Sequence, residues 1–222
     1  MRLVKRTLVL LTLWVSWAAL ANPLLPQDVT VVRPTCKEWM AQRAAEEFVR
    51  YVKLMGIVPV TLVDRAPKQA NGVVVTLEVG KVKALESLPG AEDPARLVDG
   101  FTVTGTGAMR LHFASPTARG LMYSVYHYLE NCCDVGFFWE GDHVSKLPEL
   151  PVNGIDIRQI PRWPMRSSGK AGSWGLAKFH GGFCTAETAE RVADWMAKCK
   201  LNWGGRGFGG VSDVSKPADK AE

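Results

Sequence analysis

The fold is decided by residues 99–139, which read DGFTVTGTGAMRLHFASPTARGLMYSVYHYLENCCDVGFFW. Apolar and polar side chains alternate over residues 101–104 and again over 109–113, and the glycines within 105–107 separate the two runs. A period of two is typical of strands that bury one face, and a short glycine-containing link favours a hairpin. The sequence therefore predicts two adjacent strands joined by a tight turn.

A helix is predicted directly after this hairpin. Ser115 offers an N-cap oxygen, and Pro116 supplies a first helical residue whose φ is already fixed. Apolar side chains then recur at helical spacing before Gly136, at Ala118, Leu121, Met122, Val125, Leu129 and Cys132. The apolar run 135–139 that follows suits a short buried strand.

The chain before this stretch predicts the order strand, helix, strand, strand. The strands lie at residues 29–32, 58–63 and 73–79. Thr35 and Glu38 form a capping box for the intervening helix, and the glycine at position 56 ends it. Each of the two helices carries one apolar stripe, so both are expected on the same face of a sheet. We therefore expect an α+β fold, with a small mixed β-sheet and two helices on one face.

Three strings in this region resemble one family of enzymes. They are DGF at 99–101, RG followed by MYSVYHYLE within 119–130, and DVGFFW at 134–139. With them, residues 29–166 resemble the amino-terminal domain of α-glucuronidases and of related, hexosaminidase-like glycoside hydrolases. The resemblance implies that a catalytic (β/α)8 barrel follows this domain.

The first 21 residues read as a signal peptide. Arg2, Lys5 and Arg6 form a basic n-region, residues 7–18 an apolar core, and residues 19–21 fit the small-x-small cleavage rule. We expect export to the periplasm or the extracellular space. Because the apolar run is shorter than the ~20 residues of a spanning helix, no stable membrane insertion is expected after cleavage.

Charge and cysteine content narrow the class of protein further. The formal net charge is +5, and Arg2, Lys5 and Arg6 supply three of these charges, which leaves +2 after cleavage. Without a basic run, no nucleic-acid partner is expected. The cysteine count of five is odd, so the sequence predicts no disulfide framework. Cys132 and Cys199 lie on apolar helix stripes and read as small buried side chains.

The sequence pattern of strands and helices is interrupted after residue 150. Prolines and an Asn-Gly pair make 151–161 a linker. Residues 162–167, 185–199 and 201–203 then predict the strand-helix-strand unit that opens a parallel sheet or barrel. A barrel needs about 250 residues, so residues 162–222 hold about one and a half of its units. We expect a signal peptide over 1–21, an accessory domain over 22–150, and an incomplete start of a TIM-barrel glycosidase domain over 162–222.

Candidate substrate contacts follow from this organisation, because barrel sites gather at the carboxyl ends of strands. They are Arg166 at the end of the first strand, Trp174 and His180 in the glycine-rich loop that follows, and Asn202 and Arg206 at the end of the second strand. An indole in that loop could stack on a sugar ring. Each has a structural alternative: Arg166 can equally pair with a neighbouring carboxylate, and Trp174 can cover the barrel edge.

No catalytic residue is assigned. Glycosidases need two carboxyl groups that flank the scissile bond. None of the acids after the linker is placed for that pair; they are Glu187, Glu190, Asp194, Asp213, Asp219 and Glu222. In the family the catalytic acids come from later strands.

Two further motifs are not taken as sites. Gly205, Gly207 and Gly210 match a dinucleotide-binding pattern, but no helix pattern follows them. His180, Cys184 and Cys199 lack the paired spacing of zinc ligands. We therefore expect neither a cofactor nor a metal.

These observations favour the amino-terminal portion of an exported glycoside hydrolase acting on poly- or oligosaccharides. Its partner is carbohydrate, and the chain alone should be inactive because it needs the missing remainder of the barrel. The alternative is a non-catalytic carbohydrate-binding or interaction module, which should end near Pro151. A third hypothesis is a scaffold whose half-barrel is completed by oligomerisation.

Overall fold

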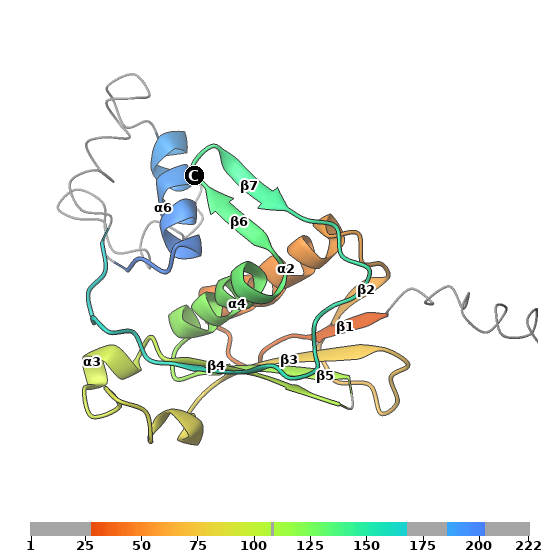
Figure 1. Ribbon diagram of the computed structural model, residues 1–222, viewed down its shortest axis with the longest axis horizontal. Helices are drawn as coiled ribbons and strands as arrows, with labels where there is room; N and C mark the ends of the chain where they lie inside the picture. The colour runs from red at the N-terminus through yellow and green to blue at the C-terminus, as the bar shows by residue number, and fades with distance from the viewer. Residues whose placement is uncertain (1–27, 108, 168–185, 203–222) are drawn as a thin grey trace, which may run out of the picture.

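The computed structural model describes residues 28–107, 109–167 and 186–202. Within these ranges the structure has two layers, a sheet and a pair of helices, with a hairpin and a third long helix beyond them (Figure 1). In chain order the elements are β1 (Val29–Val32), α2 (Trp39–Leu54), β2 (Val60–Val63), β3 (Val73–Val79), the 3-10 helix η1 (Lys83–Leu85), α3 (Pro94–Leu97), β4 (Phe101–Thr106), β5 (Arg110–Ser115), α4 (Ala118–Cys132), β6 (Val135–Phe138), β7 (Gly141–Val144), β8 (Asp156–Gln159) and α6 (Ala186–Lys198).

The main sheet has six strands in the order β2-β1-β3-β5-β4-β8. Strand β1 pairs in parallel with β2 and β3, and β3 pairs in parallel with β5. Strand β4 pairs antiparallel with both β5 and β8. Strands β6 and β7 form a separate antiparallel hairpin. The expected α+β fold with a mixed sheet is confirmed.

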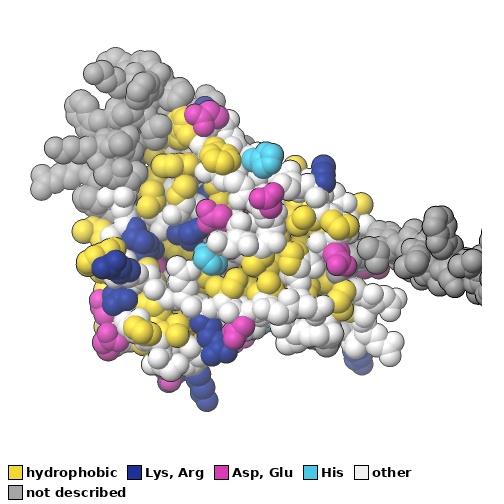
Figure 2. Space-filling model, in the orientation of Figure 1, with side chains coloured by type: hydrophobic (Ala, Val, Ile, Leu, Met, Phe, Trp, Pro, Cys, Tyr) yellow, Lys and Arg dark blue, Asp and Glu magenta, His cyan; other side chains and the backbone are white. Residues whose placement is uncertain are grey.

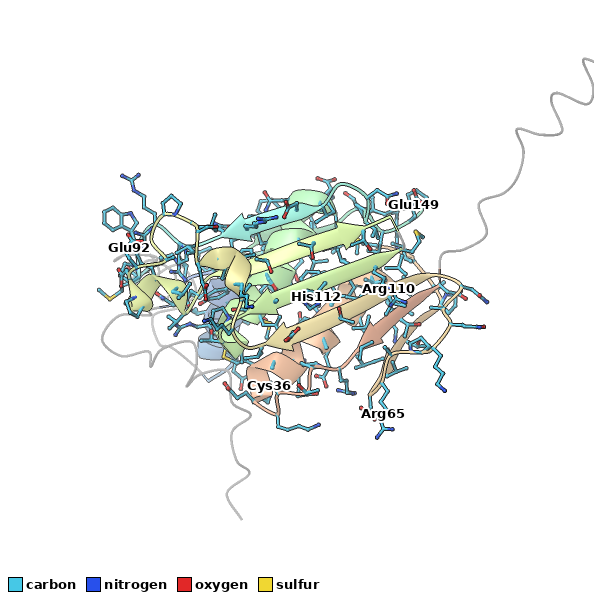
Figure 3. All side chains as sticks on the ribbon, turned by 90° about the horizontal axis from the view of Figure 1, so that it is seen from below. Cys36, Arg65, Glu92, Arg110, His112 and Glu149 are labelled. Atoms are coloured by element: carbon cyan, nitrogen blue, oxygen red, sulfur yellow. The ribbon has the colours of Figure 1, made fainter. Side chains whose placement is uncertain are left out.

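Helices α2 and α4 lie on one face of the sheet, as expected (Figure 1). Figure 3 shows the opposite face, which no helix of comparable length covers within the described ranges and where His112 and Arg110 are labelled. Side chains alternate between the two faces along each strand, which explains why one face is buried and the other is not. Phe101 and Val103 are buried beneath the helices, whereas Thr104 and His112, paired across β4 and β5, are half-buried on the other face.

The core between sheet and helices is built on aromatic contacts. The rings of Phe48, Phe113 and Tyr128 lie 5.4 to 6.0 Å apart, which joins α2, β5 and α4. Edge-to-face contacts of this kind add to the energy of apolar burial. Tyr123 and Tyr126 are 1% and 2% exposed, so the tyrosines of α4 pack inside the molecule.

The start of α4 differs from the prediction. Its N-cap is Thr117, whose hydroxyl accepts a hydrogen bond from the Gly120 N–H at 3.1 Å. The Ser115 hydroxyl instead donates to the Gly100 carbonyl at 2.7 Å. Ser115 is still part of β5, so Pro116 precedes the cap instead of opening the helix.

The start of α2 also differs from the prediction. The residue before its first turn is Glu38, and no side chain caps that end, so the expected capping box of Thr35 and Glu38 does not form. The other end is as expected: Gly56 has a φ of +90° and follows the helix. Glu47, on the polar side of this helix, is fully buried and pairs with Arg43 and Arg50.

The segment predicted as a linker contributes a strand to the sheet. Strand β8, within 151–161, pairs with β4 over four residues. Just before it, the chain crosses β4 at Gly105, where a Cβ atom would lie 1.8 Å from the Val152 carbonyl oxygen. Only a residue without a side chain allows that approach. Tyr128 fixes the same segment by donating to the Pro151 carbonyl at 2.6 Å.

Beyond β8, the described residues contain α6 but no strand at 162–167 or at 201–202. The strand prediction for these two segments is therefore wrong over the residues described. They nevertheless lie side by side, because the Asn202 N–H donates to the Arg166 carbonyl at 3.0 Å. Helix α6 contacts β7 through Lys198, which is buried and pairs with Asp142 at 2.9 Å.

The cysteines of the described residues are unpaired. Cys36, Cys132, Cys133 and Cys199 are free, and only Cys133 of these is fully buried. Cys132 and Cys199 are half-buried, so they are less enclosed than predicted. No helix in the described part of the chain combines the length and the apolar character that crossing a bilayer requires.

Candidate functional site

Asp99, the residue that begins the DGF string, is the centre of the candidate site. Its carboxylate is completely buried. The Arg119 Nε–H donates to Oδ1 at 2.7 Å. The Arg166 Nη2–H and the Asn202 Nδ2–H donate to Oδ2 at 2.7 and 2.9 Å. We call these four residues the Asp99 cluster; it joins the main sheet domain to both segments that flank α6.

Arg166 and Asn202, the two residues of this cluster that were predicted from the sequence, also bind each other. The Arg166 N–H donates to Asn202 Oδ1 at 2.8 Å, and Asn202 Nδ2 donates to the Pro164 carbonyl at 2.7 Å. The Arg166 guanidinium further donates to the carbonyls of Lys200 and Trp163, at 2.8 and 2.9 Å. Each of its three nitrogen atoms therefore has an acceptor, so the pairing expected as the structural alternative for Arg166 does occur.

Two glycines lie in closely packed positions beside the cluster. Gly120 lies in the first turn of α4, and a Cβ atom there would approach the Ser115 hydroxyl to 2.1 Å and the Gly100 carbonyl to 3.0 Å. A Cβ atom on Gly100 would lie 3.1 Å from the Leu97 carbonyl. Because Gly120 has no side chain, α4 approaches the Gly100 carbonyl at the start of β4 closely enough for Arg119 to reach Asp99.

The end of α6 positions the Lys200 carbonyl, which accepts a hydrogen bond from Arg166 of the Asp99 cluster. Lys200 has a φ of +60°, and its N–H and that of Leu201 donate to Ala197 and Met196, at 3.0 and 2.8 Å. This is a Schellman ending, in which glycine is the usual residue at the position with positive φ. Here a lysine occupies it, and its side chain pairs with Glu130 of α4. Its carbonyl is the one that accepts from Arg166.

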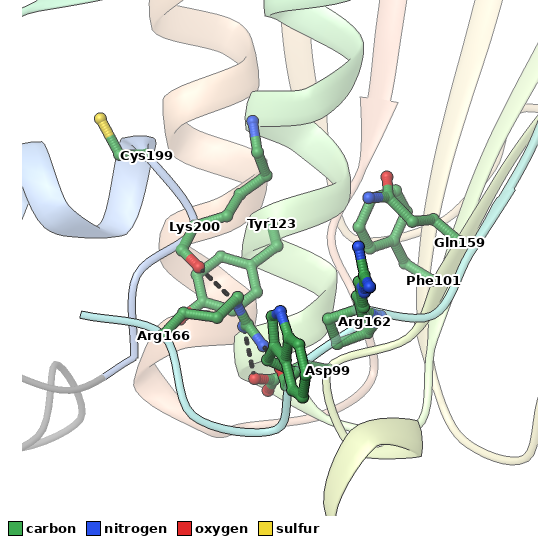
Figure 4. A pocket seen from close by; sticks show the side chains of 10 residues that line it. Asp99, Phe101, Tyr123, Gln159, Arg162, Arg166, Cys199 and Lys200 are labelled. Carbon is green, nitrogen blue, oxygen red and sulfur yellow. Dashed lines mark hydrogen bonds and ion pairs between the residues drawn. The ribbon is translucent and has the colours of Figure 1, made fainter. Parts of the chain in front are cut away.

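A cavity of about 220 Å³ opens beside the Asp99 cluster, and we call it the junction cavity (Figure 4). Arg166 and Asp99 lie at its centre in the figure, and Tyr123 of α4 lies behind them. Phe101, Trp163 and Lys200 also line it. The indole of Trp163 is 62% exposed, which is unusual for so large an apolar side chain next to a cavity.

Burial shifts the pKa values of three side chains at or near the cavity. Burial raises the pKa of the Tyr123 hydroxyl, and the charge of Asp99 adds to that effect. Burial likewise raises the pKa of the Cys199 thiol. Behind the cavity, the His127 ring lies 5.3 Å from the Phe101 ring; burial lowers the pKa of His127, and the Lys200 charge lowers it further. Tyr123 and His127 are therefore neutral near pH 7.

Positive charge predominates at this junction. Figure 2 shows a group of Lys and Arg side chains on the left of the molecule, where Figure 1 draws the segment between β8 and α6. The Asp99 carboxylate faces two guanidinium groups, those of Arg119 and Arg166. Arg162 adds a further guanidinium, stacked 5.3 Å from the ring centre of Trp163.

Of the five residues predicted as substrate contacts, the structure brings two together, Arg166 and Asn202. Trp174, His180 and Arg206 lie outside the described residues. Sequence reasoning missed Asp99 and Arg119 as site residues. The available signal was their place in the DGF and RG strings, since each string pairs a charged residue with a glycine.

The acids and metal ligands considered from sequence add little to this site. Asp194 pairs with Lys198 at 2.6 Å, and Glu190 is exposed. No group of three His, Cys, Asp or Glu side chains suited to a metal ion occurs within the ranges that the structure describes. Cys184, proposed and rejected as a ligand, lies outside them.

Comparisons with known proteins find the same fold in solved structures of low sequence identity. No protein-family model matches the chain. No curated protein matches it either. Among solved structures, a GH138 enzyme targeting pectin rhamnogalacturonan II is similar with a TM-score of 0.51 and 11% identity, over 78% of this chain and 18% of that one.

Two other solved structures are similar to the same degree. A mutant β-hexosaminidase from Streptomyces plicatus, in complex with GlcNAc, has a TM-score of 0.50 and 15% identity, over 78% of this chain and 28% of its own. A GH115 4-O-methyl-α-glucuronidase with specificity for decorated arabinogalactans has a TM-score of 0.50 and 12% identity, over 79% and 24%. The chain thus spans between 18% and 28% of these structures. It has a glycoside hydrolase-like fold.

Proposed function

We propose that this chain is the amino-terminal portion of an exported glycoside hydrolase that acts on poly- or oligosaccharides. Three glycoside hydrolases share the fold of the described residues, and each is several times longer than this chain. An accessory α+β domain followed by the first units of a barrel accounts for both facts. The α-glucuronidase-like organisation suggested by the sequence strings is part of this proposal.

The single observation that carries the proposal is the position of Arg166 and Asn202. They come from segments on either side of α6, and the Asn202 N–H donates to the Arg166 carbonyl at 3.0 Å. The two segments therefore lie side by side, as the first two strands of a barrel do, although neither is a strand over the described residues. The Asp99 cluster then fixes the ends of both segments to the accessory domain.

In this proposal Arg166 and Asn202 act first as positioning residues. Three of the five guanidinium N–H groups of Arg166 donate within the protein. The two that remain can reach a sugar hydroxyl, which keeps the predicted substrate contact open to the same side chain. Trp174, His180 and Arg206 stay proposed contacts.

The catalytic step belongs to the rest of the barrel in this proposal. One carboxylic acid protonates the leaving oxygen, and a second carboxylate acts as the nucleophile or activates water. Since no acid of this chain is assigned to either role, the 222-residue chain should hydrolyse no glycoside.

The test is to read the coding sequence past the codon for Glu222 and to express the complete frame. We expect further strand-helix units, and release of reducing sugar from aryl glycosides or polysaccharides by the complete protein only. Hydrolysis by the 222-residue chain itself would contradict the assignment of catalysis to later strands. A complete frame with no further units would favour the alternative, a non-catalytic carbohydrate-binding module, for which the junction cavity is the specific observation.

A further inference from the structure

The junction cavity has the size and lining of a binding site that the catalytic proposal does not use. Its volume of about 220 Å³ lies below the roughly 300 Å³ at which pockets for drug-sized ligands begin, so one small ring is the largest ligand that it can enclose. It is formed by α4, the segment after β8 and the end of α6, all within the described residues.

The charges around the cavity favour an anion. Among the described residues, Asp99 is the only carboxylate that lines it, and its oxygens already accept from Arg119, Arg166 and Asn202. Lys200 also lines the cavity, and its ammonium pairs with Glu130 of α4. Arg162 is exposed, and no carboxylate of the described residues lies within ion-pair distance of it. The lining therefore has an excess of positive charge.

The remaining walls favour a ring with one apolar face. Trp163 is 62% exposed, and Arg162 covers one face of its indole at 5.3 Å. The Phe101 and Tyr123 rings form the back of the cavity, and Gln159 adds an amide. Aromatic rings beside amide and guanidinium donors suit a sugar ring, whose C–H face is apolar and whose edge carries hydroxyl groups.

We propose that the junction cavity binds a single acidic sugar unit, a pyranose that carries a carboxylate or a sulfate ester. The anionic group pairs with the Arg162 guanidinium, and the ring lies against Trp163. This inference rests on the proposed function, because it deepens the carbohydrate assignment. It adds a non-catalytic subsite at the junction of the accessory domain and the barrel start.

The test is isothermal titration calorimetry of the full chain with five probes: glucuronate, glucose 6-sulfate, glucose, sodium acetate and sodium sulfate. We expect at least one anionic sugar to bind about tenfold more tightly than glucose and than the simple anion that it carries. The carboxylate and sulfate probes identify which acidic sugar the site takes. Raising NaCl from about 0.05 M to about 0.5 M should weaken that binding, because salt screens exposed charges.

Two variants and one control make the test specific. Arg162→Gln should lower the affinity for the anionic sugar about tenfold, because it removes one charge-assisted pair. Trp163→Ala should weaken all sugars that bind. Arg158→Gln removes the same charge four residues earlier, where Arg158 pairs with Asp156 on the surface, and should leave binding unchanged. Arg162 and Arg158 are both exposed, so both variants should fold.

The proposal is overturned if neither anionic sugar binds, if glucose binds equally well, or if an Arg162→Gln variant binds like wild type. These results are distinct from failure of the proposed function. If the complete frame hydrolyses glycosides while the cavity binds no acidic sugar, only the cavity assignment is lost. Acetate or sulfate that binds as tightly as the sugars would show a simple anion site and would also contradict the proposal.

Discussion

Replacing Asp99 by asparagine tests whether the Asp99 cluster holds the two parts of the chain together. The change keeps the shape of the side chain and removes its charge. Arg119 and Arg166, whose side chains are 29% and 18% exposed, would then face a neutral amide. Asn202 would lose a charged acceptor as well.

The size of the effect follows from burial. The carboxylate is 0% exposed and accepts three hydrogen bonds, of which two come from guanidinium groups. Removing one partner of a buried ion pair costs about 3 to 5 kcal/mol. Because both arginines keep some contact with water and the amide oxygen can still accept, we expect Asp99→Asn to lower the free energy of unfolding by about 2 to 3 kcal/mol.

Urea unfolding followed by far-UV circular dichroism measures this quantity, and an unchanged slope with denaturant shows that the same structure unfolds. The matched control is Asp156→Asn, which removes the same charge from an exposed pair with Arg158. Its midpoint should stay close to that of the wild type, since exposed pairs contribute little. If Asp99→Asn and Asp156→Asn have the same midpoint, the Asp99 cluster does not hold the junction together, and the argument built on it is refuted.

Three further predictions concern packing, ionisation and thiol chemistry. Gly120→Ala should lower the free energy of unfolding by about 2 to 3 kcal/mol, because the new methyl group would lie 2.1 Å from the Ser115 hydroxyl; Gly107→Ala, with no atom within 4 Å, is its control in the same urea experiment. The folded state lowers the pKa of His127, so the unfolded state takes up its proton first and stability should fall as the pH drops through about 6.5, then level off below the folded pKa. Urea midpoints of His127→Gln between about pH 5 and 8 should lack this slope, and an equal slope in the variant would assign it to other groups. Burial raises the pKa of Cys133 to about 12, so iodoacetamide should alkylate it in urea but not in the native chain, as followed by peptide mass spectrometry; rapid native labelling would contradict its burial.

Much of the fold could be predicted because its signals are local. Strands β1 and β3 have the bounds that their apolar runs predict, and Gly56 ends α2 as expected. The N-cap of α4 was placed two residues too early because Ser115 and Thr117 are both good capping residues that flank Pro116. Only the tertiary bond from Ser115 to the Gly100 carbonyl decides between them.

The candidate site could be predicted only in part. Arg166 and Asn202 were identified from their places after predicted strands, but the carboxylate that binds both lies 67 and 103 positions earlier in the chain. No periodicity relates residues so far apart. Asp99 was visible only as the first letter of a short string, and its role follows from Gly120, which allows α4 to approach the start of β4.

The pairing of β8 with β4 has a consequence for where this protein can be divided. A chain cut at Leu150, where composition alone would end the first domain, loses the crossing over Gly105 and one of the two partner strands of β4, β8. The exposed backbone groups of β4 would then be free to recruit another molecule. A chain cut after Pro161 keeps the strand and loses the bonds that Arg166 and Asn202 donate to Asp99. Gene fusions with this chain should therefore place their boundary beyond residue 160, because β8 is an edge strand of the main sheet.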